Sequence, residues 1–169
     1  MERIAKFETV SGSCFVAEAM VNLRLSKEQA LQAFENLKLP LRGTRGSAGY
    51  DFFAPCDIEL GPGETVKIPT GIRARMAEGW VLMLYPRSGL GFKYRLQLDN
   101  TVGVIDSDYY YSDNEGHIMA KLTNDSRDGR SIKIKAGEGF MQGIFTPFGI
   151  TEDDETTAVR NGGFGSTTI

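Results

Sequence analysis

Five short segments of the chain place glycine beside charged, hydroxyl or amide side chains, the residue types that hold phosphate groups and move protons. In chain order they read AGYD (residues 48–51), PRSGLG (86–91), NTVGVIDSDYY (100–110), GFMQGIF (139–145) and RNGGFGSTT (160–168). Each segment by itself also fits an ordinary polar turn, loop or tail. Only the five segments taken together indicate a chemical site.

The second and fifth segments carry groups that recognise phosphate. Arg87 supplies a planar guanidinium that can bind two oxygens at once, and Ser88 adds a hydroxyl donor. Gly89 allows backbone N–H groups to approach an anion closely. In the fifth segment, Arg160 stands beside glycines and hydroxyl side chains, and the ring of Phe164 can stack on a nucleobase. We interpret the fifth segment as a mobile phosphate clamp.

Two carboxylates stand where strands are expected to begin or end. Asp51 follows a glycine at an expected strand start, and Asp106 follows the apolar pair at 104–105. A carboxylate at the mouth of a buried strand can orient a water molecule and accept its proton, with most of the rate effect coming from position. Gln142 is the one amide in an apolar run, where such a side chain is more often exposed or bonded to backbone.

The rest of the chain predicts the elements that must position these groups. From residue 43 onward, short strand-like runs alternate with glycine turns such as GPGE at 61–64. We expect strands at residues 65–68, 71–76, 80–85, 117–122, 131–134 and 140–145. This alternation predicts an all-β sandwich, jelly roll or barrel.

The N-terminal part has a different pattern. Residues 3–10 partly alternate and predict a strand. A capping-box pattern at residues 26–29 begins a helix that Pro40 brings to an end. The apolar face of this helix consists of Leu31, Phe34 and Leu37. We expect that face to pack on the body of the protein rather than to bind a partner.

Composition narrows the class of protein. The 169 residues are 41% hydrophobic and 24% charged, which fits one globular domain. The net charge of −3 argues against a general nucleic-acid-binding surface. The start of the chain lacks a signal-peptide pattern and no run is long enough to span a membrane, so we expect a cytoplasmic protein. Cys14 and Cys56 have no metal or redox spacing and are expected to be buried or half-buried free thiols.

In their order and spacing, the five segments together resemble the motifs of the trimeric dUTP pyrophosphatase (dUTPase) family, from about residue 39 to the C-terminus. The resemblance implies a jelly-roll-like dUTPase β-barrel with a short helix near the N-terminus. It implies a single domain over residues 1–169, with an N-terminal extension at 1–38 and a mobile arm at 159–169. It also implies Mg²⁺-dependent hydrolysis of dUTP at the α-phosphorus to dUMP and pyrophosphate.

The resemblance further implies a homotrimer with shared active sites and a role for each site residue. Asp106 would activate the attacking water, and Tyr109 would lie against the deoxyribose and exclude a 2′-hydroxyl. Asn100 and the hairpin at Gly103 would read the uracil edge, and Mg²⁺ would be held mainly by phosphates and water, with Asp51 at most in the outer shell. The remaining substrate contacts would come from Arg87 (also paired with Asp51), Ser88, Gly89, Gln142, Arg160, Phe164, Gly165, Ser166 and Thr167.

The chain also departs from the family pattern. Residues 110–115 form an insertion beside the expected sugar contact, before Gly116. His117, the only histidine, takes the position of the usual Glu or Gln. Because Asp106 already fills the position of the base, we expect a structural or interface role for His117. Arg160 stands one residue closer to the following glycines than in many members of the family.

Two alternatives stay open at this point. A dCTP deaminase shares the fold, but that relative carries an RSS-type segment with a second arginine and a catalytic glutamate, whereas this chain has Gly89 after Ser88 and has Asp106. The other alternative is a dUTPase with an added regulatory role. Residues 110–115 or the N-terminal helix would then bind another protein, as inserted segments do in some phage members of the family.

Overall fold

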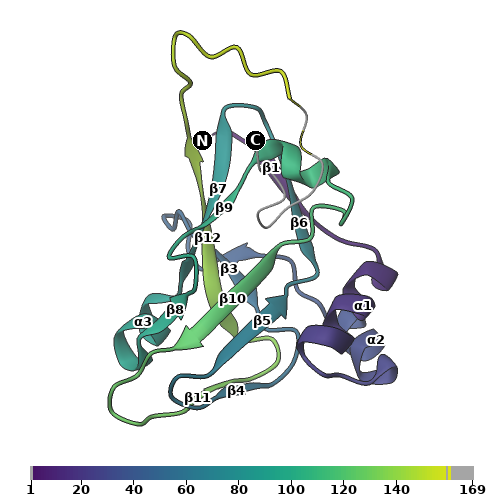
Figure 1. Cartoon of the computed structure of the whole chain (residues 1–169), viewed down its shortest axis with the longest axis vertical. Coiled ribbons are helices and arrows are strands. Elements are labelled where there is room, and N and C mark those ends of the chain that lie inside the picture. The colour runs from purple at the N-terminus through teal and green to yellow at the C-terminus, as the bar shows by residue number, and fades with distance from the viewer. Residues whose placement is uncertain (1, 159, 161–169) are drawn as a thin grey trace.

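The computed structural model describes residues 2–158 and 160, and in this part of the chain strands dominate while helices are minor (Figure 1). The largest sheet has the strand order β2-β3-β12-β7-β9. Its strands are β2 (Leu41–Arg42), β3 (Tyr50–Phe53), β12 (Gly139–Pro147), β7 (Trp80–Pro86) and β9 (Gly103–Ile105). This sheet positions most of the candidate site residues.

Smaller antiparallel sheets complete the β-rich body. One has the order β5-β10-β8, and two further pairs are β1-β6 and β11-β4. Their bounds are β1 (Ala5–Thr9), β4 (Ile58–Leu60), β5 (Thr65–Pro69), β6 (Ile72–Met76), β8 (Leu96–Leu98), β10 (Met119–Asn124) and β11 (Ile132–Ile134). Short antiparallel strands in several sheets match the jelly-roll-like fold that the sequence predicted.

One apolar core lies between the sheets. In β4, β8 and β11 the buried and exposed residues alternate with a period of two, so each strand turns one face inward. The largest side chains that are almost fully buried in this core include Phe52, Ile68, Leu82, Leu84, Leu122 and Phe140. These residues hold β3, β7 and β12 together and thereby fix the positions of the groups at the strand ends.

The N-terminal part forms two helices where the sequence predicted only one. The predicted helix is α2 (Lys27–Glu35), and its capping box between Ser26 and Gln29 is present. The missed helix is α1 (Gly12–Asn22), and both lie on one side of the sheets (Figure 1). A small core of Val10, Phe15, Val16, Ala19 and Ala30 lies between them.

The expectation for the face of α2 was partly wrong. Phe34 and Leu37 pack against the small core, but Leu31 is 45% exposed. Leu37 closes onto Gly71 so tightly that a Cβ atom there would lie 2.3 Å from Leu37 Cδ1. Gly71 also has a positive φ of 72°, which favours glycine. The helical hairpin is therefore packed onto the start of β6, whose partner strand is β1.

Two helical segments follow the strands that carry the candidate residues. Helix α3 (Ser88–Tyr94) follows β7, although residues 86–91 contain two glycines and no helix was predicted there. The 3₁₀ helix η1 (Ser107–Tyr111) follows β9. None of the helices in the described part of the chain has the length and apolar composition needed to cross a membrane. Cys14 and Cys56 are free and half-buried, as predicted.

Candidate active site

The first group of predicted site residues lies where β3, β12 and the start of α3 meet. Asp51 on β3 is the register partner of Gln142 on β12. Arg87, the residue that precedes α3, places its Nε 3.3 Å from Asp51 Oδ1 and donates from Nη1 to the Gly139 carbonyl at 3.4 Å. A Cβ at Gly49 would lie 2.6 Å from Gln142 Oε1, so a larger residue there would have to displace the end of the Gln142 side chain. We call Asp51, Arg87, Ser88, Gly89 and Gln142 the phosphate cluster.

The phosphate cluster presents its polar groups to solvent. Arg87, Ser88 and Gly89 are exposed, while Asp51 and Gln142 are half-buried. The Asp51 carboxylate and the Gly139 carbonyl hold the guanidinium of Arg87 through Nε and Nη1, and its other N–H groups can bind a further acceptor. A guanidinium oriented in this way is suited to bind phosphate oxygens.

The second group lines a cavity of about 510 Å³ beside β9. Four residues predicted to contact water, sugar or base are there: Asn100, Gly103, Asp106 and Tyr109. A Cβ at Gly103 would lie 3.0 Å from Leu84, so glycine lets β9 approach β7 closely. The other lining residues are Leu84, Leu98, Asp99, Val102, Val104, Ile105, Met119, Lys121 and Arg160. We call this space the base cavity.

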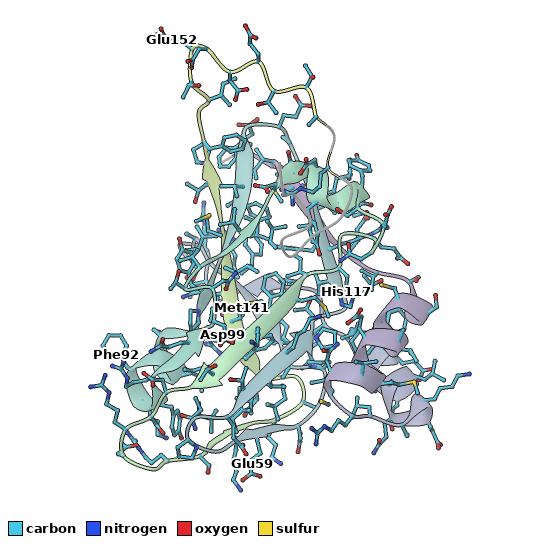
Figure 2. All side chains as sticks on the ribbon, viewed as in Figure 1. Glu59, Phe92, Asp99, His117, Met141 and Glu152 are labelled. Carbon is cyan, nitrogen blue, oxygen red and sulfur yellow. The ribbon has the colours of Figure 1, made fainter. Side chains whose placement is uncertain are left out.

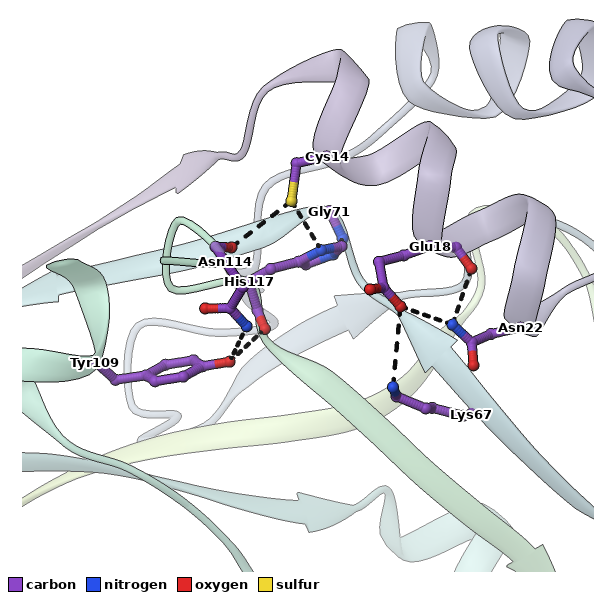
Figure 3. Close-up of polar contacts among 8 residues, drawn as sticks. All are labelled: Cys14, Glu18, Asn22, Lys67, Gly71, Tyr109, Asn114 and His117. Atoms are coloured by element: carbon purple, nitrogen blue, oxygen red, sulfur yellow. Dashed lines mark hydrogen bonds and ion pairs between the residues drawn. The ribbon is translucent and has the colours of Figure 1, made fainter. Parts of the chain in front are cut away.

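Tyr109 forms part of the wall of the base cavity and is held by its hydroxyl. Only 4% of the residue is exposed, and its burial raises the pKa of the phenol. The hydroxyl donates to the His117 carbonyl at 2.8 Å and accepts from Asn114 Nδ2 at 2.7 Å (Figure 3). Asn114 was not among the predicted site residues. Its position in the inserted segment, close to Tyr109 in sequence, is the signal that could have indicated it.

His117 has a structural place, as expected. It is 1% exposed, and its Nε2 accepts a hydrogen bond from the Gly71 backbone N–H at 2.9 Å (Figure 2, Figure 3). Burial lowers the pKa of His117 to about 4, so the ring is neutral near neutral pH. Cys14 Sγ lies 3.7 Å from His117 Nδ1, and burial raises the pKa of that thiol. A neutral histidine beside a protonated thiol is a packing arrangement rather than a reactive pair.

Arg160 contacts carboxylates of its own chain. Its guanidinium pairs with Asp106, and its Nε donates to Asp108 Oδ1 at 2.9 Å. The sequence had assigned Arg160 to the phosphates of a substrate. The predicted contacts of Phe164, Gly165, Ser166 and Thr167 lie outside the described residues.

The phosphate cluster and the base cavity lie at different places along β7. The register pairs Leu84 with Gly103 and Leu82 with Ile105, so Asp106 follows at the level of Val81. Arg87 follows Val81 by six residues, in the direction in which β7 runs. At about 3.3 Å per residue, this places Asp106 and Arg87 roughly 20 Å apart within one chain. The two groups are therefore separated within this chain.

Comparison with known proteins identifies the class to which this fold and these residues belong. The dUTPase family model matches residues 35–168. The chain is similar to curated deoxyuridine 5′-triphosphate nucleotidohydrolases. The one from Lactococcus lactis is 44% identical over 134 residues, and the match covers 78% of this chain and 88% of the relative. Another, from Escherichia coli O9:H4, is 42% identical over 135 residues, and the match covers 75% of this chain and 85% of the relative. The chain belongs to the dUTPase family.

Solved structures agree with this assignment. The crystal structure of the dUTPase from Streptococcus mutans is 35% identical, with a TM-score of 0.64 over 86% of this chain and 98% of that chain. A mutant dUTPase from phage phi11 of S. aureus is 20% identical and shares the fold, with a TM-score of 0.64 over 92% of this chain. That phage structure shows the coordination of a structural Mg(II) ion. The predicted class of enzyme, a nucleotide hydrolase rather than a deaminase, is therefore confirmed.

Proposed function

We propose that this protein is a dUTP pyrophosphatase that uses Mg²⁺ and hydrolyses dUTP at the α-phosphorus to give dUMP and pyrophosphate. The observation that carries the proposal is the base cavity, which is lined by Asn100 from the loop before β9, Gly103 from β9, Asp106 from between β9 and the 3₁₀ helix η1, and Tyr109 from η1. Their residue types match what a deoxyuridine nucleotide requires: a carboxylate, an aromatic wall and a polar loop.

The active site is proposed to be shared between subunits of a homotrimer. The reacting phosphorus must be reached by the guanidinium of Arg87 and by the water held by Asp106. These two residues lie roughly 20 Å apart along one chain, so they meet at one phosphorus only if they come from different copies. We infer that one subunit supplies the phosphate cluster, a second the base cavity and a third the arm at residues 159–169.

In the proposed reaction, Asp106 accepts a proton from a water molecule whose oxygen forms a bond to the α-phosphorus. The bond from that phosphorus to the bridging oxygen breaks, and pyrophosphate leaves. Arg87, Ser88, Gly89 and Gln142 of the neighbouring subunit hold the phosphate oxygens in line for the attack. Arg160 would exchange its contact with Asp106 for the γ-phosphate, together with Ser166 and Thr167.

Substrate selection is proposed to take place in the base cavity. Asn100 and the backbone at Gly103 would pair with the uracil edge, so that cytosine would leave buried polar groups unpaired. If the uracil packed closely against the backbone at Gly103, a 5-methyl group would find little room. Tyr109 would fill the space that a 2′-hydroxyl requires, while Phe164 and Gly165 of the arm close over the base.

The described residues fit a Mg²⁺ ion that arrives with its nucleotide. No group of three or more His, Cys, Asp or Glu side chains within residues 2–158 and 160 could hold a metal ion by itself. Asp51, the carboxylate of the phosphate cluster, already pairs with Arg87, so it would reach the ion through water. Such an ion supplies a fixed triphosphate geometry and offsets charge on the leaving group.

The proposal is tested by measuring pyrophosphate release from dUTP, UTP, dTTP and dCTP side by side, with Mg²⁺ and with EDTA. We expect rapid release from dUTP only, and only with the metal ion. Equal rates with all four nucleotides would contradict the proposed selectivity. Sedimentation of the purified protein should give a trimer, and a monomer with full activity would rule out the shared site.

We place the enzyme in the cytoplasm, without a nucleic-acid or membrane partner.

A further inference from the structure

The inserted segment and the N-terminal extension, the two parts of the chain without a place in the proposed reaction, contact each other. Both the backbone N–H and the side-chain hydroxyl of Ser11 donate to the Glu115 carboxylate, at 2.7 and 2.5 Å. The Tyr110 hydroxyl donates to Glu8 Oε2 on β1 at 2.5 Å, and Arg73 stacks over the Tyr110 ring at 4.5 Å. Residues about a hundred positions apart are thereby joined beside the base cavity.

The bond to Ser11 connects the inserted segment to the start of a helix. Ser11 is the N-cap of α1, where its hydroxyl also accepts from the Cys14 N–H at 3.2 Å. The Glu115 carboxylate therefore lies at the positive end of the helix dipole, which favours a negative charge. These hydrogen bonds hold the pKa of Glu115 below its usual range, so the contact is ionised near neutral pH.

The backbone of the inserted segment is held in one unusual conformation. Glu115 and Gly116 have consecutive positive φ angles of 60° and 67°. The first is disfavoured for a residue with a side chain, and its contacts with Ser11 stabilise it. A Cβ at Gly116 would lie 2.7 Å from Tyr110 Cα, so this turn packs directly on the backbone that carries Tyr109.

Asn114 transmits this arrangement to the wall of the base cavity. Its Oδ1 accepts from the Gly116 N–H at 3.2 Å. Its Nδ2 donates to the Tyr109 hydroxyl at 2.7 Å (Figure 3). Its carbonyl lies 3.6 Å from Cys14 Sγ on α1. The Asn114 side chain thus connects the turn to the phenol that faces the cavity, and its backbone carbonyl contacts the N-terminal helix.

We propose that Asn114 is a positioning residue that fixes the ring of Tyr109, and that the N-terminal extension supports it through the contact between Ser11 and Glu115. The inference rests on the proposed function, because it assigns to Asn114 a part in rejecting the ribonucleotide. Residues 1–34 lie outside the part of the chain that matches the family. The extension, which lies outside the family domain, thus supports the wall of the base cavity that Tyr109 forms.

The test compares kcat/KM for dUTP and UTP in Asn114→Ala, with wild type and Tyr111→Ala as references. Tyr111 is in the same segment, but its side chain is 76% exposed. Loss of one hydrogen bond to the phenol should lower the dUTP to UTP selectivity of Asn114→Ala by roughly tenfold, mainly by raising activity on UTP. Tyr111→Ala should keep the selectivity of wild type.

A double-mutant cycle separates positioning from general damage to the fold. In a Tyr109→Phe background the hydroxyl is absent, so adding Asn114→Ala should change selectivity less than about twofold. An equal loss in both backgrounds would overturn the proposed route through the phenol. Glu115→Gln, which keeps the size of the side chain but removes its charge, should lower selectivity by roughly threefold. If Asn114→Ala does not fold, the Glu115→Gln variant is used for the test in its place.

The outcomes for the two proposals are distinguishable. Failure of wild type to release pyrophosphate from dUTP would reject the proposed function itself. A wild type that prefers dUTP, together with a folded Asn114→Ala or Glu115→Gln variant of unchanged selectivity, would reject only the positioning role. Thermal unfolding and trimer size, measured on the same samples, establish that each variant compared is folded and assembled.

Discussion

The guanidinium of Arg160 binds the carboxylate of Asp106, and this contact joins residues 54 positions apart. Arg160 is the last residue that the structure describes, so the contact brings the beginning of the arm to the edge of the base cavity. The same guanidinium also donates to Asp108. Two carboxylates therefore share one cation, and their separate contributions can be tested by removing each charge in turn.

Asp106→Asn should remove most of the turnover while binding of dUTP persists. The amide has the same size as the carboxylate, but it cannot accept a proton from water. A lost general base costs roughly a hundredfold or more in kcat, whereas the contacts to base, sugar and phosphates remain. Pyrophosphate release gives the rate, and titration calorimetry with dUTP gives the affinity. Full activity of this variant would refute the assignment of the base.

The matched control is Asp108→Asn, which removes the other carboxylate bound by Arg160. This side chain is 50% exposed and is not assigned a role in the reaction. Its kcat should stay within about threefold of wild type, because an exposed ion pair contributes little. Equal losses in the two variants would mean that anchoring Arg160, and not activating water, is the function of Asp106.

Arg87→Lys should raise the KM for dUTP by roughly tenfold, because lysine keeps the charge but loses the planar pair of donors. Steady-state kinetics measures this change. Arg95→Lys is the matched control, since Arg95 binds Asp125 Oδ2 through two nitrogens at 3.0 and 2.9 Å and is similarly exposed. An unchanged KM in Arg87→Lys would place the phosphates elsewhere.

The order of the five segments predicted the family and the strands that carry the site, because those segments are local in sequence. Six expected strands are present as β5, β6, β7, β10, β11 and β12. Most of their ends differ from the expected ones by one or two residues. The proximity of Asp51, Arg87 and Gln142 was also anticipated, through the expected pair of Asp51 with Arg87 and their common place at the phosphates. For this part, the resemblance to the family's motifs was sufficient.

The features that sequence reasoning missed depend on contacts between distant residues or on weak local signals. Helix α1 begins at Gly12 after the single N-cap Ser11, and its buried residues Phe15, Val16 and Ala19 form too short a pattern to stand out. Helix α3 has no side-chain cap. The bonds from Ser11 to Glu115 cross 104 positions, and no periodicity reports such a pair. The added regulatory role for residues 110–115 stays a prediction.

Truncation after Ala158 should reduce turnover on dUTP by roughly a hundredfold or more while the midpoint of unfolding changes little. The removed residues include the proposed contacts to the γ-phosphate and the base, each of which acts on the bound nucleotide. The described contacts that are lost are those of Arg160 with Asp106 and Asp108, two partly exposed ion pairs worth about 1 kcal/mol or less each. Pyrophosphate release and thermal unfolding are measured together, and an unchanged rate would reject the arm.

The single histidine predicts how stability depends on pH. The pKa of His117 is about 4 in the folded protein, against about 6.5 for an unperturbed histidine, because burial disfavours its charged form. Glu115 opposes this shift, and Lys67 adds to it. Between pH 6.5 and 4 the unfolded chain therefore binds a proton that the folded chain does not, so the free energy of unfolding falls as the pH falls.

His117→Gln should remove this part of the pH dependence, because the amide oxygen can accept from the Gly71 N–H but does not titrate. In wild type the histidine alone should lower the free energy of unfolding by about 3 kcal/mol between pH 7 and pH 4. Above pH 6.5 the histidine is mainly neutral in both the folded and the unfolded protein, so the free energy of unfolding no longer falls because of it. Urea unfolding of both proteins at pH 7, 6, 5 and 4 measures the difference. Parallel curves for wild type and His117→Gln would show that the folded protein accommodates a charged ring, against the burial that the structure describes.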